Sequence, residues 1–117
     1  MVDVRCLLVD DSPEFLASAA RLLESQGIDV VGCATSAGEA LELVAALEPN
    51  LALVDIELGD EDGIALAQHL VGLVPSMRVV LISTHDPADV GELVVESRAA
   101  GFLPKSALGA EAIGAFF

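Results

Sequence analysis

The chain has 117 residues, of which 54% are hydrophobic, and it carries 19 acidic residues against 5 basic ones. This length fits one domain with a substantial core, because domains commonly run about 100–150 residues. The net charge of −14 argues against direct binding of nucleic acid, which needs a basic face. Charges, prolines and glycines interrupt every apolar stretch before it could span a membrane, and no signal peptide is evident, so we expect a cytoplasmic protein.

The first apolar run, residues 4–9, predicts a strand, and the segment after it predicts a helix. Ser12 followed by Pro13 is a typical helix start, and Gly27 is a typical stop. Five apolar residues in between repeat at helical spacing and define the expected core face: Phe15, Leu16, Ala19, Leu22 and Leu23.

Two further strand and helix pairs follow. Residues 28–33 and 51–54 predict the second and third strands. Ser36 with Glu39 forms a capping box for the helix between them, which Pro49 ends. The third helix, residues 63–74, follows an acidic loop and stops before Pro75. Its expected core residues are Leu66, Ala67, Leu70, Leu73 and Val74.

The last two units complete the pattern. Residues 79–82 predict the fourth strand, and Asp86 with Pro87 opens a helix that Gly101 closes. Residues 101–103 predict a short fifth strand. A fifth helix of about three turns is expected from Ala107 to the end of the chain.

Five strand and helix pairs in alternation predict an α/β fold with a doubly wound parallel sheet and five helices. The strand runs are continuously apolar, which is typical of strands buried on both faces. Cys6 and Cys33 lie inside two of these runs without metal-ligand spacing, so we expect two buried, reduced thiols.

Ligands of such sheets bind outside the carboxyl ends of the strands. The residues just after the predicted strands are Asp10, Asp11, Asp55, Ser83 and Lys105, the only lysine in the chain. Converging carboxylates need a cation, and carboxylate ligands favour Mg²⁺ over Zn²⁺. With Mg²⁺ held by the paired aspartates, Asp55 could act as a nucleophile towards phosphorus, assisted by Lys105 and the Ser83 hydroxyl.

Four motifs, LLVDD, ALVDIELGDEDG, VVLIST and GFLPKSA, occur in this order along the chain. Together they resemble the receiver domain of bacterial two-component response regulators, and the resemblance covers residues 1–117. It implies a flavodoxin-like sheet with strand order 2-1-3-4-5. It also implies a signalling switch driven by phosphorylation, which catalyses its own phosphoryl transfer and is not otherwise an enzyme.

The resemblance implies a role for each site residue. Asp55 is the expected phosphoacceptor, modified by a sensor histidine kinase or by a small phosphodonor. Asp10 and Asp11 are the expected Mg²⁺ ligands, with Asp11 the more direct one. Glu57 is expected to contribute its backbone carbonyl to the metal.

Ser83 is expected to bind the phosphoryl group, and Lys105 to pair with it. Phe102 occupies an aromatic switch position, with simple packing as the alternative. Phosphorylation would then alter the surface of the fourth helix, fifth strand and fifth helix, with homodimerisation as one expected result. His85 either tunes dephosphorylation or is passive, and His69 is expected to be structural or solvent-facing.

Departures from the family pattern are informative. Gly59 stands where proline is common, and Ser106 follows Lys105 where proline is common. The second departure resembles the NarL/FixJ subgroup, whose outputs are helix-turn-helix DNA-binding domains that control transcription. No such output domain is present in this chain, and the terminal Phe116 and Phe117 need a partner surface, so we expect the receiver portion of a longer regulator.

Two alternatives stay open. The chain could be a stand-alone receiver that acts by contact with a partner protein. A haloacid-dehalogenase-like phosphatase would also use an aspartate nucleophile and Mg²⁺, but the sequence Asp55-Ile56-Glu57 lacks the second aspartate of that class. The acidic loop of Glu57, Asp60, Glu61 and Asp62 is expected beside the site, with Asp62 as a helix cap rather than as part of a second metal site.

Overall fold

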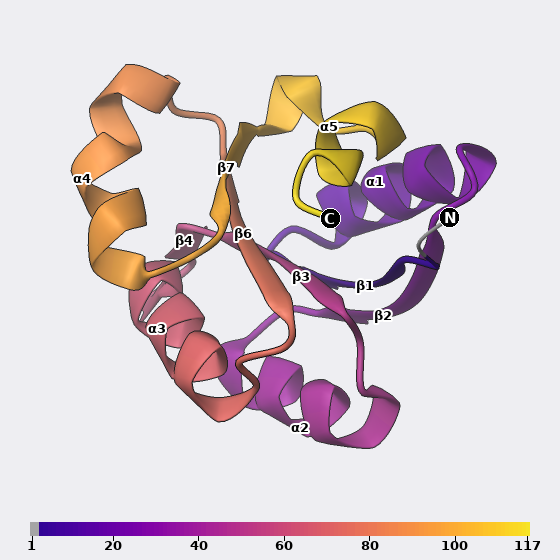
Figure 1. Cartoon of the computed structure of the whole chain (residues 1–117), viewed down its shortest axis with the longest axis horizontal. Helices are drawn as coiled ribbons and strands as arrows, with labels where there is room; N and C mark the ends of the chain where they lie inside the picture. The colour runs from indigo at the N-terminus through magenta and orange to yellow at the C-terminus, as the bar shows by residue number, and fades with distance from the viewer. Residues whose placement is uncertain (1–2) are drawn as a thin grey trace.

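A parallel five-stranded sheet forms the centre of the computed structural model, which describes residues 3–117 (Figure 1). The strands are β1 (Arg5–Val9), β2 (Asp29–Ala34), β3 (Leu51–Asp55), β6 (Arg78–Ser83) and β7 (Gly101–Pro104). Their order across the sheet is β2-β1-β3-β6-β7. Because β4 (Glu57–Leu58) and β5 (Glu61–Asp62) form a separate antiparallel hairpin, this is the predicted order 2-1-3-4-5.

Helices cover both faces of the sheet, as a doubly wound fold requires (Figure 1). One face carries α1 (Pro13–Ser25) and α5 (Ala110–Gly114), packed on a core that includes Leu8, Leu53 and Ile82. The other face carries α2 (Ala37–Leu47), α3 (Gly63–Leu73) and α4 (Pro87–Ser97). None of the helices within residues 3–117 has both the length and the apolar character needed to cross a bilayer.

The predicted helix starts are present, with one difference in detail. The Ser12 hydroxyl accepts a hydrogen bond from the backbone N–H of Phe15 and caps α1. The Ser36 hydroxyl accepts from the N–H of Glu39, but the Glu39 carboxylate accepts from Thr35, one residue before the position that a capping box uses. The cap geometry nevertheless fixes the start of α2 where the sequence predicts it.

The prediction of a three-turn fifth helix is wrong. A single 3₁₀ turn, η1 (Lys105–Ala107), is followed by extended backbone at Leu108, and α5 has only five residues. Gly109 and Gly114 flank and end this segment, and glycine is a weak helix former. The chain then turns so that Phe116 packs on the core beside Gly101. Any larger residue at position 101 would place its β-carbon against the Phe116 ring.

Two arginine side chains donate hydrogen bonds to backbone carbonyls of distant segments, at the end of α2 and at Phe116. The Arg5 guanidinium donates to the carbonyls of Leu47 and Glu48, the second at 2.8 Å, at the end of α2. The Arg78 Nε donates to the carbonyl of Phe116 at 3.0 Å, and the guanidinium lies 5.9 Å from the centre of the Phe117 ring. The terminal phenylalanines therefore find part of their partner surface within the chain.

Three residues predicted to be buried are exposed instead. Leu22 and Leu73, assigned to the core faces of their helices, are 41% and 56% exposed. Cys33 is also exposed, because β2 is an edge strand and is only partly covered. Cys6 is buried as predicted, and both cysteines are free.

Candidate functional site

Four predicted site residues lie at the carboxyl edge of the sheet. Asp10 directly follows β1, Asp55 ends β3, Ser83 ends β6, and Lys105 follows β7. The parallel register places the ends of these strands side by side, since Asp55 pairs with Ile82 and Ser83 pairs with Pro104. The structure thus brings together side chains that the sequence separates by up to 95 positions.

The acidic residues converge closely at this edge. Asp10 is fully buried, Asp55 is 6% exposed and Asp11 is exposed. One carboxylate oxygen from each of the three lies within 4.8 Å of the other two. A cavity of about 240 Å³ opens beside them, and Asp11, Asp55, Glu57, Gly59, Ser83, Thr84 and Lys105 line it.

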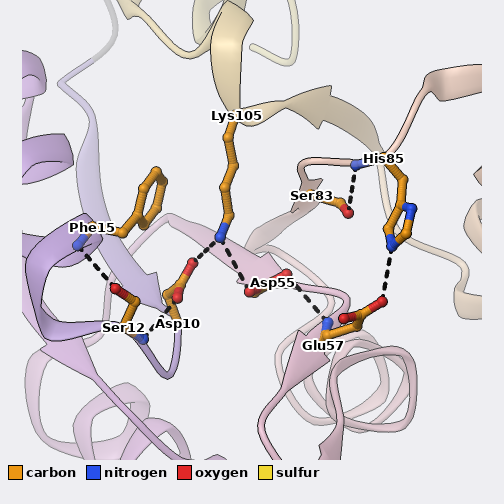
Figure 2. A network of polar contacts seen from close by, with 8 residues as sticks. All are labelled: Asp10, Ser12, Phe15, Asp55, Glu57, Ser83, His85 and Lys105. Atoms are coloured by element: carbon orange, nitrogen blue, oxygen red, sulfur yellow. Dashed lines mark hydrogen bonds and ion pairs between the residues drawn. The ribbon is translucent and has the colours of Figure 1, made fainter.

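The Lys105 ammonium bridges two of these carboxylates. Its Nζ lies 2.6 Å from Asp10 Oδ2 and 3.2 Å from Asp55 Oδ2 (Figure 2). Burial acts to lower the pKa of Lys105, but the close contact with Asp10 and the charges of Asp55 and Asp10 outweigh burial and raise it. Lys105 therefore remains a cation at neutral pH.

At Asp55, by contrast, burial has a larger effect on the pKa than the favourable contacts around the carboxylate. Burial raises the pKa of Asp55, and the charge of Asp10 adds to the increase. A hydrogen bond from the Glu57 backbone N–H to Asp55 Oδ1, at 3.2 Å, opposes the rise, as does the charge of Lys105. The ionised carboxylate is therefore incompletely compensated by the protein groups around it.

The site fits a divalent cation. Three carboxylates against one ammonium leave a formal charge of −2 when all are ionised. Asp10 Oδ2 is buried and, among the described residues, accepts no hydrogen bond of good geometry, so its ion pair with Lys105 is its one strong contact. Oxygen donors suit hard cations such as Mg²⁺ and Ca²⁺. Asp11 lines the cavity, whereas Asp10 does not.

A second set of contacts lies on the far side of Asp55 (Figure 2). The Ser83 hydroxyl accepts a hydrogen bond from the backbone N–H of His85 at 3.1 Å. The His85 ring reaches the Glu57 carboxylate, with 2.8 Å between Nε2 and Oε1. The sequence marked His85 as a candidate but carried no sign of its partner, because the two residues are 28 positions apart.

The hairpin differs from the expected acidic loop beside the site. Glu57 lines the cavity, but Glu61 points to α2, where its carboxylate accepts a hydrogen bond from the N–H of Ala37 at 3.0 Å. Asp62 caps α3 through the N–H of Ile64, as predicted. Gly59 has a φ of 60°, which proline cannot adopt, so this turn differs physically from one that carries proline.

Two aromatic residues lie on elements that flank the site, one on β7 and one on α1. Phe102 on β7 is half-buried and packs on the core that α2, α3 and α4 cover. Phe15, predicted only as a core residue of the first helix, places its ring 4.3 Å from the Lys105 ammonium. Its helical spacing identified it as apolar but could not indicate this contact, which depends on how α1 docks beside η1.

Comparison with known proteins gives consistent matches over most of the chain. The family model described as the response regulator receiver domain matches residues 6–114. Over 113 residues, the chain is 35% identical to "Probable transcriptional regulatory protein NarL" of Mycobacterium tuberculosis, covering 96% of this chain and 52% of that protein. The solved signal receiver domain of that NarL has a TM-score of 0.80 and covers 92% of this chain and 88% of that domain.

Two further matches extend the comparison. A Pseudomonas syringae protein-glutamate methylesterase/protein-glutamine glutaminase is 36% identical over 88% of this chain and 27% of its own length. A response regulator from Burkholderia pseudomallei, solved with a phosphorylated aspartic acid, calcium ion and citrate, is 31% identical with a TM-score of 0.83. The match covers 97% of this chain and 65% of the Burkholderia chain. The chain thus spans between about a quarter and a half of the curated relatives described above.

Proposed function

Because the chain belongs to the response regulator receiver domain family, we propose that Asp55 accepts a phosphoryl group from a sensor histidine kinase or a small phosphodonor. The observation that carries this proposal is the meeting of three carboxylates and the single lysine beside one cavity. Asp55 is the one carboxylate that belongs to the acidic cluster, pairs with Lys105 and lines the cavity. We propose that residues 1–117 form this receiver domain.

Mg²⁺ is the cation that we propose for the acidic cluster. Asp10, Asp11, Asp55 and the backbone carbonyl of Glu57 would hold it. When bound, a divalent cation neutralises charge on the carboxylates and on the phosphoryl oxygens. The related Burkholderia regulator with a phosphorylated aspartic acid and a calcium ion supports this part of the proposal.

The reaction is a transfer of the phosphoryl group to oxygen. A carboxylate oxygen of Asp55 forms the new bond to phosphorus, and the bond from phosphorus to the donor breaks, so the donor leaves with the electron pair. The Lys105 ammonium, already within reach of Asp55, pairs with the added negative charge. The Ser83 hydroxyl lines the same cavity and can donate a hydrogen bond to a phosphoryl oxygen.

Signalling follows from the change in these contacts. When the Ser83 hydroxyl turns to the phosphoryl group, it gives up its present position beside the His85 N–H. Phe102, half-buried on the adjacent strand, then turns inward and alters the surface of α4, β7 and α5. Charge-assisted hydrogen bonds contribute about 1.5–3 kcal/mol each, which is enough to shift a two-state surface when several act together.

We also propose that this surface controls an output that regulates transcription, by contact with an output domain or partner protein or through a homodimer. The NarL regulator supports this choice, because its match spans nearly all of the present chain. Nucleic acid is not the proposed ligand of the receiver domain itself, given its net charge of −14. The methylesterase relatives make an enzymatic output the second candidate.

The test is labelling with acetyl phosphate in the presence of Mg²⁺, followed by intact-protein mass spectrometry. We expect one phosphoryl group on the wild type, none on Asp55→Asn, and normal labelling of Asp60→Asn, a matched change in the exposed hairpin. Chelation of divalent cations by EDTA should abolish the labelling. Persistent labelling of Asp55→Asn would show that another residue is the acceptor.

A further inference from the structure

The face of the Phe15 ring is the third contact of the Lys105 ammonium, beside the two carboxylates. The Nζ atom lies 4.3 Å from the ring centre, within the range of a cation–π interaction. Phe15 is half-buried, and the Lys105 side chain is 17% exposed, so the contact is partly screened from water. We propose that Phe15 is a positioning residue that holds the Lys105 ammonium at Asp55 for phosphoryl transfer.

A closed circuit of contacts, in which each residue touches the next and the last returns to the first, supports this role (Figure 2). Its members are Asp10, Ser12, Phe15 and Lys105. Asp10 Oδ1 accepts a hydrogen bond from the Ser12 N–H at 2.9 Å, and the Ser12 hydroxyl accepts from the Phe15 N–H at 3.2 Å. The Phe15 ring lies against the Lys105 ammonium, which returns to Asp10 through the 2.6 Å contact with Oδ2. The N-cap of α1 therefore links the Asp10 carboxylate to the backbone of Phe15, whose ring lies against the lysine.

The circuit matters because lysine is a flexible side chain. An ammonium on a four-carbon stem has many rotamers, and one carboxylate contact does not select among them. Both carboxylates in contact with Nζ are also ligand candidates for a cation, so their hold on Lys105 weakens when a divalent ion competes. The neutral ring cannot bind that ion in their place, and it keeps the ammonium beside the cavity.

This inference rests on the proposed function and adds a residue to it. If Phe15 orients Lys105, loss of the aromatic face should slow phosphorylation of Asp55 while the fold is kept. Leucine conserves an apolar side chain but has no π face, whereas tyrosine retains the face. The pair Phe15→Leu and Phe15→Tyr therefore separates the cation–π contact from packing.

The sequence offers a direct spectroscopic readout. Lys105 is the only lysine, so protein made with ¹³C-labelled lysine gives NMR signals from this side chain alone. Protons above an aromatic ring resonate at unusually low frequency. We expect shifted ε-methylene signals in the wild type and in Phe15→Tyr, and ordinary lysine values in Phe15→Leu. Unshifted ε-methylene signals in the wild type would overturn the proposal before any rate is measured.

Phosphorylation rates provide the second readout, with acetyl phosphate and saturating Mg²⁺. We expect Phe15→Leu to be slower than the wild type by about 3- to 10-fold, and Phe15→Tyr to keep most of the rate. Leu22→Ala, an exposed change on the same helix, is the matched control. Thermal unfolding followed by circular dichroism checks that each variant is folded, and Phe15→Met replaces Phe15→Leu if the latter is not.

The outcomes are distinct. Ordinary lysine shifts and slow labelling in Phe15→Leu, both restored in Phe15→Tyr, support the positioning role. Unchanged shifts in Phe15→Leu, an unchanged rate, or equal slowing by Phe15→Tyr would overturn it. A wild type that is not labelled at Asp55 would instead refute the proposed function, and the shifts would still decide whether Phe15 holds the lysine.

Discussion

The imidazole of His85 and the carboxylate of Glu57 lie 2.8 Å apart, joining the loop after β6 to the hairpin after β3. Both side chains are more than half exposed, at 51% and 71%, so this contact adds little to stability. Glu57 also lines the cavity beside Asp55, and the His85 N–H holds the Ser83 hydroxyl. The pair therefore lies beside the proposed phosphoryl site and contributes little to the stability of the fold.

We predict that His85→Ala shortens the lifetime of phosphorylated Asp55 by about two- to five-fold, because water reaches the cavity more easily without the pair. The measurement is the decay of the phosphorylated mass after the donor is removed. His69→Ala, an exposed histidine change on α3, should leave the lifetime unchanged. Equal lifetimes in all three proteins would mean that His85 is passive.

Asp55→Asn should raise the free energy of unfolding at pH 7 without divalent cations, on the order of 1 kcal/mol, because the ionised carboxylate is buried. Burial raises the pKa of Asp55 above that of the unfolded chain, so protonation favours the folded state. The advantage of the variant should therefore shrink as the pH falls through the pKa of Asp55.

Urea unfolding of the wild type, Asp55→Asn and the exposed Asp60→Asn, each at neutral and acidic pH, measures this difference. Asp60→Asn should match the wild type at both. A less stable Asp55→Asn at pH 7 would show that the pairing of Asp55 with Lys105 outweighs the cost of burying the carboxylate.

Gly63 and Gly72 on α3 provide a matched pair. A β-carbon on Gly63 would overlap the backbone carbonyl oxygens of Asp55 and Ile56, whereas one on Gly72 would meet no atom within 4 Å. Gly63→Ala should cost about 3 kcal/mol or more and impair labelling of Asp55, because the backbone must shift there. Gly72→Ala should add about 0.5–1 kcal/mol of stability. Denaturant unfolding of both variants measures these changes in the free energy of unfolding. Equal changes in the two variants would contradict the close approach of Gly63 to the backbone of Asp55 and Ile56.

The two thiols should differ in reactivity. Burial, together with the nearby Cys33, raises the pKa of Cys6 from 9.0 to about 12. Burial and the acids Glu24 and Glu39 also raise the pKa of Cys33, but this thiol is exposed. At pH 8, iodoacetamide should modify Cys33 slowly and leave Cys6 unmodified until the protein unfolds. Peptide mapping identifies the site, and Cys33→Ser should take no label when folded.

The shift at Cys6 also has a consequence for alkaline stability. The unfolded chain releases the Cys6 proton near pH 9 while the folded chain retains it, so this contribution to stability is full below pH 9. It should be lost as the pH rises from about 9 towards 12. Urea unfolding of the wild type and of Cys6→Val across this pH range tests the prediction. The free energy of unfolding should fall more steeply with pH in the wild type, because valine has no thiol to ionise.

The strand ends were predictable from the sequence because continuous apolar runs mark buried parallel strands. Asp10, Asp55, Ser83 and Lys105 each follow such a run, and parallel strands place their carboxyl ends at one edge. The motif resemblance supplied the strand order, which composition alone does not determine. The helix caps at Ser12 and Asp62 were also predictable, because each is a local hydrogen bond.

What escaped prediction depends on contacts between distant segments. The length of α5 is set by the bend at Leu108 and the packing of Phe116 beside Gly101. Exposure of Cys33 depends on which strand lies at the sheet edge. The contact of Phe15 with Lys105 joins segments 90 positions apart and has no periodic signal in the sequence.

The contacts of Arg5 and Arg78 with backbone carbonyls also affect the electrostatic potential around the protein. Arg5 and Arg78 direct their guanidinium groups to backbone carbonyls, and Lys105 lies among carboxylates, so three of the five basic side chains are committed to the fold and the site. Most of the acidic side chains face solvent. A partner with a basic docking face will therefore be steered to this domain, and its association rate will fall as the ionic strength rises.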